Sequence, residues 1–186
     1  MQPTASEPIS ALELQWYLLS IRYEEWRLND VFHFKWWLLL ILFIVSAYVW
    51  WKLVDKSRLV EIVLFTGLVS IIALVLDELG EELTLWDYSI DLIPLFPPIT
   101  SIDLASLPVA YSFIYQYFTT WKKFIIATVV MSAVFSFILE PIFVWGGIYQ
   151  TITWKYYYGF PIYIALAICV KAMVIKLNTI TANSQK

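Results

Sequence analysis

Residues 34–54 read FKWWLLLILFIVSAYVWWKLV, an apolar run with a tryptophan pair near each end. A segment that is apolar on every side suits a helix surrounded by lipid and by other helices. Tryptophan favours membrane interfaces, so Trp36–Trp37 and Trp50–Trp51 are predicted to be interfacial anchors. The whole chain is 61% hydrophobic and 15% charged, whereas soluble domains are about 45–50% apolar and about 25% charged. We therefore expect an integral membrane protein.

The other apolar runs predict the architecture. We expect an all-α, polytopic membrane helix bundle of about five transmembrane helices, over residues 34–54, 59–77, 104–119, 124–144 and 160–177. Residues 1–33 are predicted to form a tail and an amphipathic helix that lies in the membrane interface, because this segment is too polar to span. Its apolar side chains recur at helical spacing, as Leu12, Trp16, Leu19 and Tyr23. Residues 178–186 are a C-terminal tail.

Basic residues predict the orientation of the bundle, because they are enriched in cytoplasmic loops. They fall after the first span, between the third and fourth spans, and after the last span: Lys52, Lys56, Arg58, Lys122, Lys123, Lys176 and Lys186. This pattern places the N-terminus outside and the C-terminus in the cytoplasm. Arg22, Arg27 and Lys35 lie on the wrong side for this assignment.

Three carboxylates are predicted to meet near the outer ends of the spans. Counted from the inner ends of their helices, Asp77 and Glu140 both lie at about 24–26 Å, at a rise of 1.5 Å per residue. Asp103 opens the third span from the same side. These three residues are the candidate catalytic groups.

Glu140 is the strongest single candidate, because it lies inside an apolar span and directly precedes Pro141. A charge in that place is costly unless it is neutral, paired or hydrated, and Pro141 frees the carbonyl of Phe137 by removing a backbone donor. The functional interpretation is a proton carrier, an acid catalyst or a ligand-binding carboxylate. The alternative is a kinked helix whose glutamate reaches water or pairs with Lys155 or Lys171.

The two outer loops bring aromatic and acidic side chains to the same region. The candidate ligand-binding residues there are Trp86, Asp87, Tyr88, Trp145, Tyr149 and Trp154. Their convergence predicts an outward-facing vestibule. The alternative is that the aromatic residues are mostly interfacial anchors.

A run of carboxylates at the end of the second span offers weak candidates for metal binding: Asp77, Glu78, Glu81 and Glu82. Oxygen ligands suit a hard divalent cation, but the spacing is not that of an EF-hand loop and no histidine lies among them. The alternative is the solvated end of a helix. Beyond this candidate cation we predict no cofactor. The net charge of −3 is too small to indicate nucleic-acid binding.

Three motifs in one order carry a family resemblance: LDELGEELTLWDYSIDLIPLFPP, DLASLPVAYSFIYQYFTTWKKF and EPIFVWGGIYQTITWKYYYGFPIY. Over residues 35–177 the chain resembles a family of small multi-span membrane proteins of Gram-positive, spore-forming bacteria. That resemblance implies a bacterial plasma-membrane location and about five helices, and it transfers no catalytic residue, because the family has no assigned biochemical function. More loosely, the chain resembles small membrane-embedded terpene and carotenoid cyclases, in which carboxylates protonate an isoprenoid. This second resemblance implies such roles for Asp77 and Glu140.

Three functions therefore stay open, all with the lipid bilayer as partner. The first is a non-enzymatic envelope protein whose vestibule binds a ligand or a partner. The second is an enzyme that acts on a lipid or an isoprenoid by carboxylate acid catalysis, and the third is a proton or cation pathway. A closed apolar pocket reached by two carboxylates would favour the enzyme, and a continuous polar path to Lys171 would favour transport. A bundle without a cavity would favour a structural role. The sequence does not indicate the oligomeric state.

Overall fold

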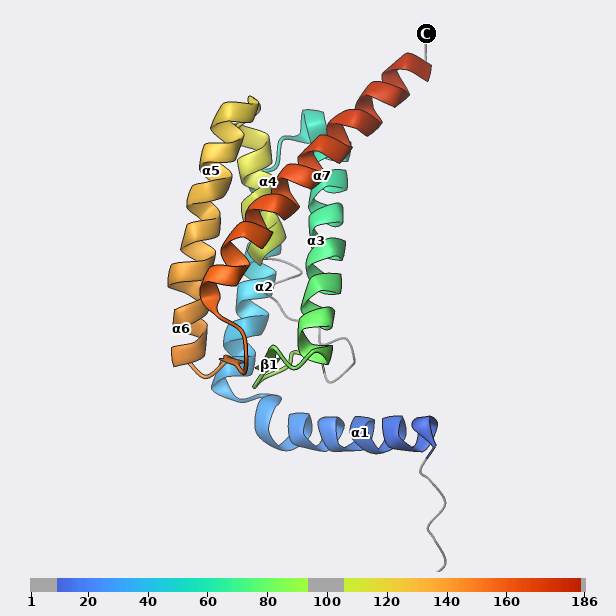
Figure 1. The fold of residues 1–186 in the computed structure, drawn as a ribbon, viewed down its shortest axis with the longest axis vertical. Coiled ribbons are helices and arrows are strands. Elements are labelled where there is room, and N and C mark those ends of the chain that lie inside the picture. The colour runs from blue at the N-terminus through green and yellow to red at the C-terminus, as the bar shows by residue number, and fades with distance from the viewer. Residues whose placement is uncertain (1–9, 94–105, 185–186) are drawn as a thin grey trace, which may run out of the picture.

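The computed structural model describes residues 10–93 and 106–184, which form a helical bundle with one small two-stranded antiparallel sheet (Figure 1). This pair of strands comes from distant parts of the chain and is called the hairpin. The helices are α1 (Ala11–Glu25), α2 (Phe34–Leu53), α3 (Leu59–Glu82), α4 (Leu107–Tyr117), α5 (Trp121–Val134), α6 (Glu140–Trp145) and α7 (Tyr156–Ser184). Short turns adjoin them: the π-helical η1 (Trp26–Asp30) and η4 (Phe135–Leu139), and the 3₁₀ turn η2 (Lys56–Arg58). The strands are β1 (Trp86–Tyr88) and β2 (Tyr149–Thr151).

In this part of the chain, helices at four of the five predicted positions are long and apolar enough to cross a membrane. They cover Phe34–Leu53, Lys56–Glu82, Trp121–Trp145 and Tyr156–Ser184. The predicted third span, 104–119, is the exception. Its helix α4 has 11 residues, a length of about 16 Å, which is too short for a hydrocarbon core of about 30 Å. A count of five spans is thus not confirmed, and Asp103 lies outside the described residues.

The boundaries of two spans also differ from the prediction. Helix α3 continues past the predicted end at residue 77 to Glu82, so the acidic run 77–82 forms the last turns of this helix. Helix α7 begins at Tyr156 and extends to Ser184, beyond the predicted 160–177 on both sides. Pro161 lies in its second turn and removes one intrahelical bond, to the Tyr157 carbonyl, but the helix continues through it.

The core lies where α3, α4, α5 and α7 meet. Phe65, Tyr111, Phe124 and Val170 are fully buried there, and Phe65 stacks on Tyr115 with ring centroids 4.2 Å apart. The single polar atom of Tyr111 is satisfied, because its hydroxyl lies 2.9 Å from that of Ser132. By contrast, many large apolar side chains on the outer faces of α2, α3 and α5 are exposed, as a lipid-facing surface requires.

Helix α1 lies crosswise beneath the bundle, next to the end that carries the hairpin (Figure 1). A capping box starts it: the Glu13 backbone N–H donates to the Ser10 hydroxyl, and the Ser10 N–H donates to the Glu13 carboxylate. All of its residues are exposed. Apolar side chains such as Leu14, Leu18 and Ile21 lie on the face opposite Leu12, Trp16 and Leu19, so the predicted amphipathic character of this helix is not confirmed.

The two ends of the bundle differ in chemistry. One end gathers η2, the turn between α4 and α5, and the C-terminus (Figure 1), which includes the basic residues Lys56, Arg58 and Lys123. The other end carries the hairpin, the end of α6 and the acidic end of α3. In the hairpin β1 and β2 are antiparallel, with Asp87 opposite Gln150. This arrangement agrees with the alternation of charge on which the predicted orientation rests.

Candidate functional site

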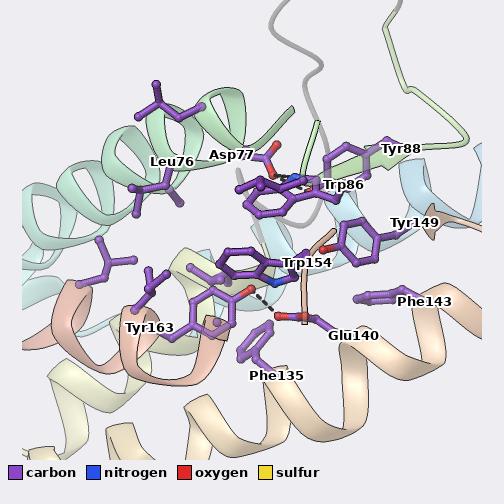
Figure 2. A pocket seen from close by; sticks show the side chains of 18 of the residues that line it. Leu76, Asp77, Trp86, Tyr88, Phe135, Glu140, Phe143, Tyr149, Trp154 and Tyr163 are labelled. Carbon is purple, nitrogen blue, oxygen red and sulfur yellow. Dashed lines mark hydrogen bonds between the residues drawn. The ribbon is translucent and has the colours of Figure 1, made fainter. Parts of the chain in front are cut away.

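A cavity of about 240 Å³ lies at the hairpin end of the bundle, between α3, η4–α6, the hairpin and the start of α7 (Figure 2). Most of its walls are leucine and aromatic side chains. Asp77 and Glu140 are the acidic residues in its wall. The two residues that sequence analysis placed at equal depth on different helices therefore line one cavity.

Asp77 lies on α3 and is 8% exposed. Its Oδ1 accepts hydrogen bonds from Trp86 Nε1 at 3.1 Å and from the Tyr88 hydroxyl at 2.7 Å. Both donors belong to β1, so this carboxylate fixes the hairpin to the helix. Gly80 makes the contact sterically feasible, because a Cβ there would lie 1.9 Å from the Trp86 ring.

Glu140 begins α6 and is 9% exposed. Its Oε1 accepts a hydrogen bond of 2.9 Å from the Tyr163 hydroxyl of α7, while its Oε2 is buried without a hydrogen-bond partner in the described part of the chain. Helix α7 approaches closely at Gly159, where a Cβ would lie 3.0 Å from Oε1. The π-helical turn η4 ends directly before Glu140, so the backbone irregularity predicted from Pro141 is a widened turn rather than a break.

Aromatic rings lie between and around these two carboxylates (Figure 2). Trp154 meets Trp86 edge to face, with centroids 4.8 Å apart. Tyr149 lies 5.5 Å from Tyr88, and Phe135 packs against Tyr163. The hairpin and the start of α7 thus supply most of the rings.

The structure gathers most of the predicted site residues but not all of them. Asp77, Trp86, Tyr88, Glu140, Tyr149 and Trp154 line the cavity. Trp145 is 91% exposed on the outside of α6. Asp87 is also exposed and accepts a hydrogen bond from Gln150.

Sequence reasoning missed Tyr163, Phe135, Phe143 and the two glycines. A signal for Tyr163 was present, since it lies near the outer start of the last span, at the depth expected for Glu140. No comparable signal pointed to Gly80 or Gly159, because their role depends on which neighbouring side chain approaches them.

The alternative that Glu140 pairs with Lys171 is wrong. Lys171 Nζ donates to the backbone carbonyls of Phe118 and Thr119, at 3.1 and 3.0 Å, and it lies 4.0 Å from the centroid of the Phe124 ring. These contacts hold the ammonium group toward the basic end of the bundle. The predicted alternative partner Lys155 is exposed.

A row of buried hydroxyls runs along α5 and η4 below Glu140: Thr128, Ser132 and Ser136. The Thr128 and Ser136 hydroxyls have no hydrogen-bond partner among the described residues. The Ser132 hydroxyl bonds to Tyr111, and within the described residues no hydrogen bond joins the row to Glu140 or to Lys171.

A second, polar hollow lies between η1, the end of α3 and the loop after β1, and several acidic residues line it. Asp91 occupies its wall, where its backbone N–H donates to Asp30 Oδ2 at 3.2 Å. Burial, and then the negative charges of Asp30 and Asp87, raise the pKa of Asp91 to about 7. Burial also raises the pKa of Asp30.

The four carboxylates proposed for metal binding do not converge. Asp77 faces the apolar cavity, Glu81 faces the polar hollow and Glu82 is exposed. The described ranges contain no group of three or more acidic, histidine or cysteine side chains arranged to hold a metal ion.

No protein family, curated protein or solved structure matches this chain. The family resemblance that the three sequence motifs suggest stays a prediction.

Proposed function

We propose that this chain is an integral plasma-membrane protein that binds a small, mainly apolar ligand, such as a lipid or an isoprenoid, in the cavity between α3, α6, α7 and the hairpin. The observation that carries the proposal is an apolar cavity with two buried carboxylates in its wall. Ligand sites are typically concave, mostly apolar and equipped with a few polar groups that orient the ligand. The hairpin end faces outward in the predicted topology, so the ligand enters from the outer half of the bilayer.

Acid catalysis on an isoprenoid is a second candidate function for the same cavity. The observation that favours it is the pairing of Glu140 with Tyr163 beside aromatic rings. In such a reaction the protonated carboxyl of Glu140 gives its proton to a carbon–carbon double bond, which leaves a carboxylate and a carbocation. Aromatic faces attract positive charge, and loss of a proton from the product cation to the carboxylate restores the acid.

The test of ligand binding uses two matched variants on α3. Ala73 lines the cavity and is 6% exposed, whereas Val75 is 54% exposed on the outside of the same helix. We expect wild-type protein and Val75→Phe to co-purify a small apolar molecule from their membranes, and Ala73→Phe to lose it, because the new ring fills the cavity. Native mass spectrometry, followed by solvent extraction and chromatography, measures the bound molecule.

Equal amounts in the two phenylalanine variants, or none in the wild type, would contradict the proposal. The same extraction separates the two candidate functions. Binding alone returns a supplied isoprenoid unchanged, whereas catalysis returns a cyclised or isomerised product that Glu140→Gln fails to make.

A further inference from the structure

The acidic and basic side chains in the cavity wall are unequal in number. Asp77 and Glu140 line it, and the described lining residues include no lysine, arginine or histidine. The basic side chains that might reach it are engaged elsewhere. Lys171 bonds to carbonyls near the other end of the bundle, and Lys35 Nζ donates to the Gly147 carbonyl at 3.0 Å. An anionic ligand would therefore meet two carboxylates and no compensating charge.

Glu140 offers a specific contact for a donor. Its side chain is nine-tenths buried, Tyr163 donates to Oε1, and Oε2 has no hydrogen-bond partner in the described part of the chain. A buried acceptor without a partner is costly. A ligand that carries an N–H or O–H group to Oε2 would remove that cost, and a charged N–H donor would form the stronger bond.

The aromatic wall favours a positive charge over a neutral donor. Trp86, Trp154 and Tyr149 stand near the two carboxylates (Figure 2). The faces of such rings attract cations, and aromatic enclosures recognise substituted ammonium groups. The same walls disfavour a bare divalent ion, because calcium requires six to eight oxygen ligands and this cavity is mostly apolar.

We infer that the ligand is an organic cation, a protonated amine with apolar substituents, whose N–H meets Glu140 Oε2 while its apolar part fills the leucine-lined space between α3 and α7. This inference rests on the proposed function, since it names the chemical class of the ligand of the same cavity. The carboxylates supply the charge, the rings shield the ammonium group from lipid, and the apolar walls accept the substituents.

The test compares three probes of similar shape against purified protein in an uncharged detergent. N,N-dimethylbenzylamine is cationic at neutral pH, isobutylbenzene is its neutral counterpart, and phenylacetate is anionic. Equilibrium binding is measured by titration calorimetry, with empty micelles as the reference for partitioning. We expect the cation to bind at least tenfold more tightly than the neutral probe and phenylacetate not to bind. In Glu140→Gln the preference for the cation should disappear while the neutral probe still binds. Glu82→Gln, which changes an exposed acid at the end of α3, should keep the preference.

The outcomes separate the two proposals. Equal binding of the cation and the neutral probe to wild-type protein would overturn the inference and leave apolar ligand binding intact. Binding of neither probe would count against both proposals. The wild-type comparison requires no variant to fold, so it decides the inference even if Glu140→Gln is unstable. If Glu140→Gln folds and keeps the full preference, Glu140 is not the recognition group and the inference is wrong.

Discussion

Two glycines set the distances at which the carboxylates of the cavity meet their neighbours. At Gly80 the Trp86 ring occupies the place of a side chain, with ring atoms 1.9–2.5 Å from where a Cβ would lie. At Gly159 the nearest atoms are Glu140 Oε1 at 3.0 Å and the ring of Tyr163 at 3.3 Å. The first contact admits no side chain at all, whereas the second is merely tight.

The first residue-scale prediction concerns Gly80→Ala. The added methyl group would overlap the Trp86 ring, so the indole must move and its hydrogen bond to Asp77 must lengthen or break. Overpacking of this kind costs about 1–3 kcal/mol. We expect a lower thermal midpoint in detergent and faster amide exchange in β1. Gly67→Ala is the matched control, because nothing lies within 4 Å of its Cβ position on the same helix. Equal midpoints for the two variants would show that the hairpin adapts without cost.

Single functional residues were predictable from the sequence where a charged side chain lies within an apolar segment. A carboxylate in an apolar span is costly, and this cost singled out Glu140 and drew attention to Asp77. The partners of these groups were not predictable to the same degree. Tyr163 and Trp86 become partners only through the packing of α7 and the hairpin, and aromatic residues near interfaces are common for other reasons.

At the scale of elements, the turn η1 and the start of α2 are attached to the loop after β1 by three hydrogen bonds. Trp26 Nε1 donates to the Asp91 carbonyl at 3.1 Å, and the Asp91 N–H donates to Asp30. Trp36 Nε1 donates to the Leu92 carbonyl at 3.1 Å. Through these contacts the crosswise helix α1 is coupled to the end of the bundle that holds the cavity.

This attachment is predicted to weaken as the pH rises. The pKa of Asp91 is raised from 3.8 to about 7 in the folded protein, so the folded state holds this proton more tightly than the unfolded state. The stabilisation that comes from protonated Asp91 is complete below about pH 4 and is lost as the pH rises through about 7. The raised pKa of Asp30 acts in the same direction. We expect amide exchange in η1, corrected for its intrinsic pH dependence, to be slower at about pH 5 than at about pH 8.

Asp91→Asn tests the cause, because the amide stays neutral at both values of pH. The variant should show a smaller pH dependence of η1 protection than the wild type. Glu24→Gln is a suitable control, since Glu24 is exposed and its ion pair with Arg27 lies on the surface. A pH dependence that is unchanged in Asp91→Asn would assign the effect to another group.

Elements formed by local interactions were predictable from the sequence, and elements formed by contacts between distant segments were not. Helices α2, α3 and α7 were predicted because their apolar runs are long and local. The hairpin was not predicted, because each strand has three residues and the partners Trp86 and Thr151 are far apart in the chain. The third span was predicted as a short one over 104–119, and α4 covers Leu107–Tyr117 of it, since an apolar run shows where a helix can lie but not where it begins and ends.

At the scale of the whole molecule, the bundle holds different polar contacts at its two ends. At the basic end Arg58 pairs with Glu61 at 3.0 Å, Tyr115 donates to the same carboxylate, and Lys171 is held by carbonyl groups. At the other end, Asp77 and Glu140 accept hydrogen bonds from tryptophan and tyrosine side chains. Acidic groups beside an apolar cavity thus lie at one end of the bundle, and compensated basic groups lie at the other.

The final prediction tests which end of the bundle faces the outside of the cell and which end faces the cytoplasm. It uses two exposed positions at opposite ends of the bundle. Glu82 ends α3 beside the hairpin, and Lys123 lies in the first turn of α5 at the basic end. Cys169, which is exposed on the surface of α7, is first replaced by Ser so that each variant has a single thiol. In intact cells an impermeant maleimide should label Glu82→Cys, and it should label Lys123→Cys only after the membrane is opened, because basic loops are retained in the cytoplasm. Labelling of position 82 only after opening would invert the topology. The cavity would then face the cytoplasm, and its ligand would have to come from the inner half of the bilayer.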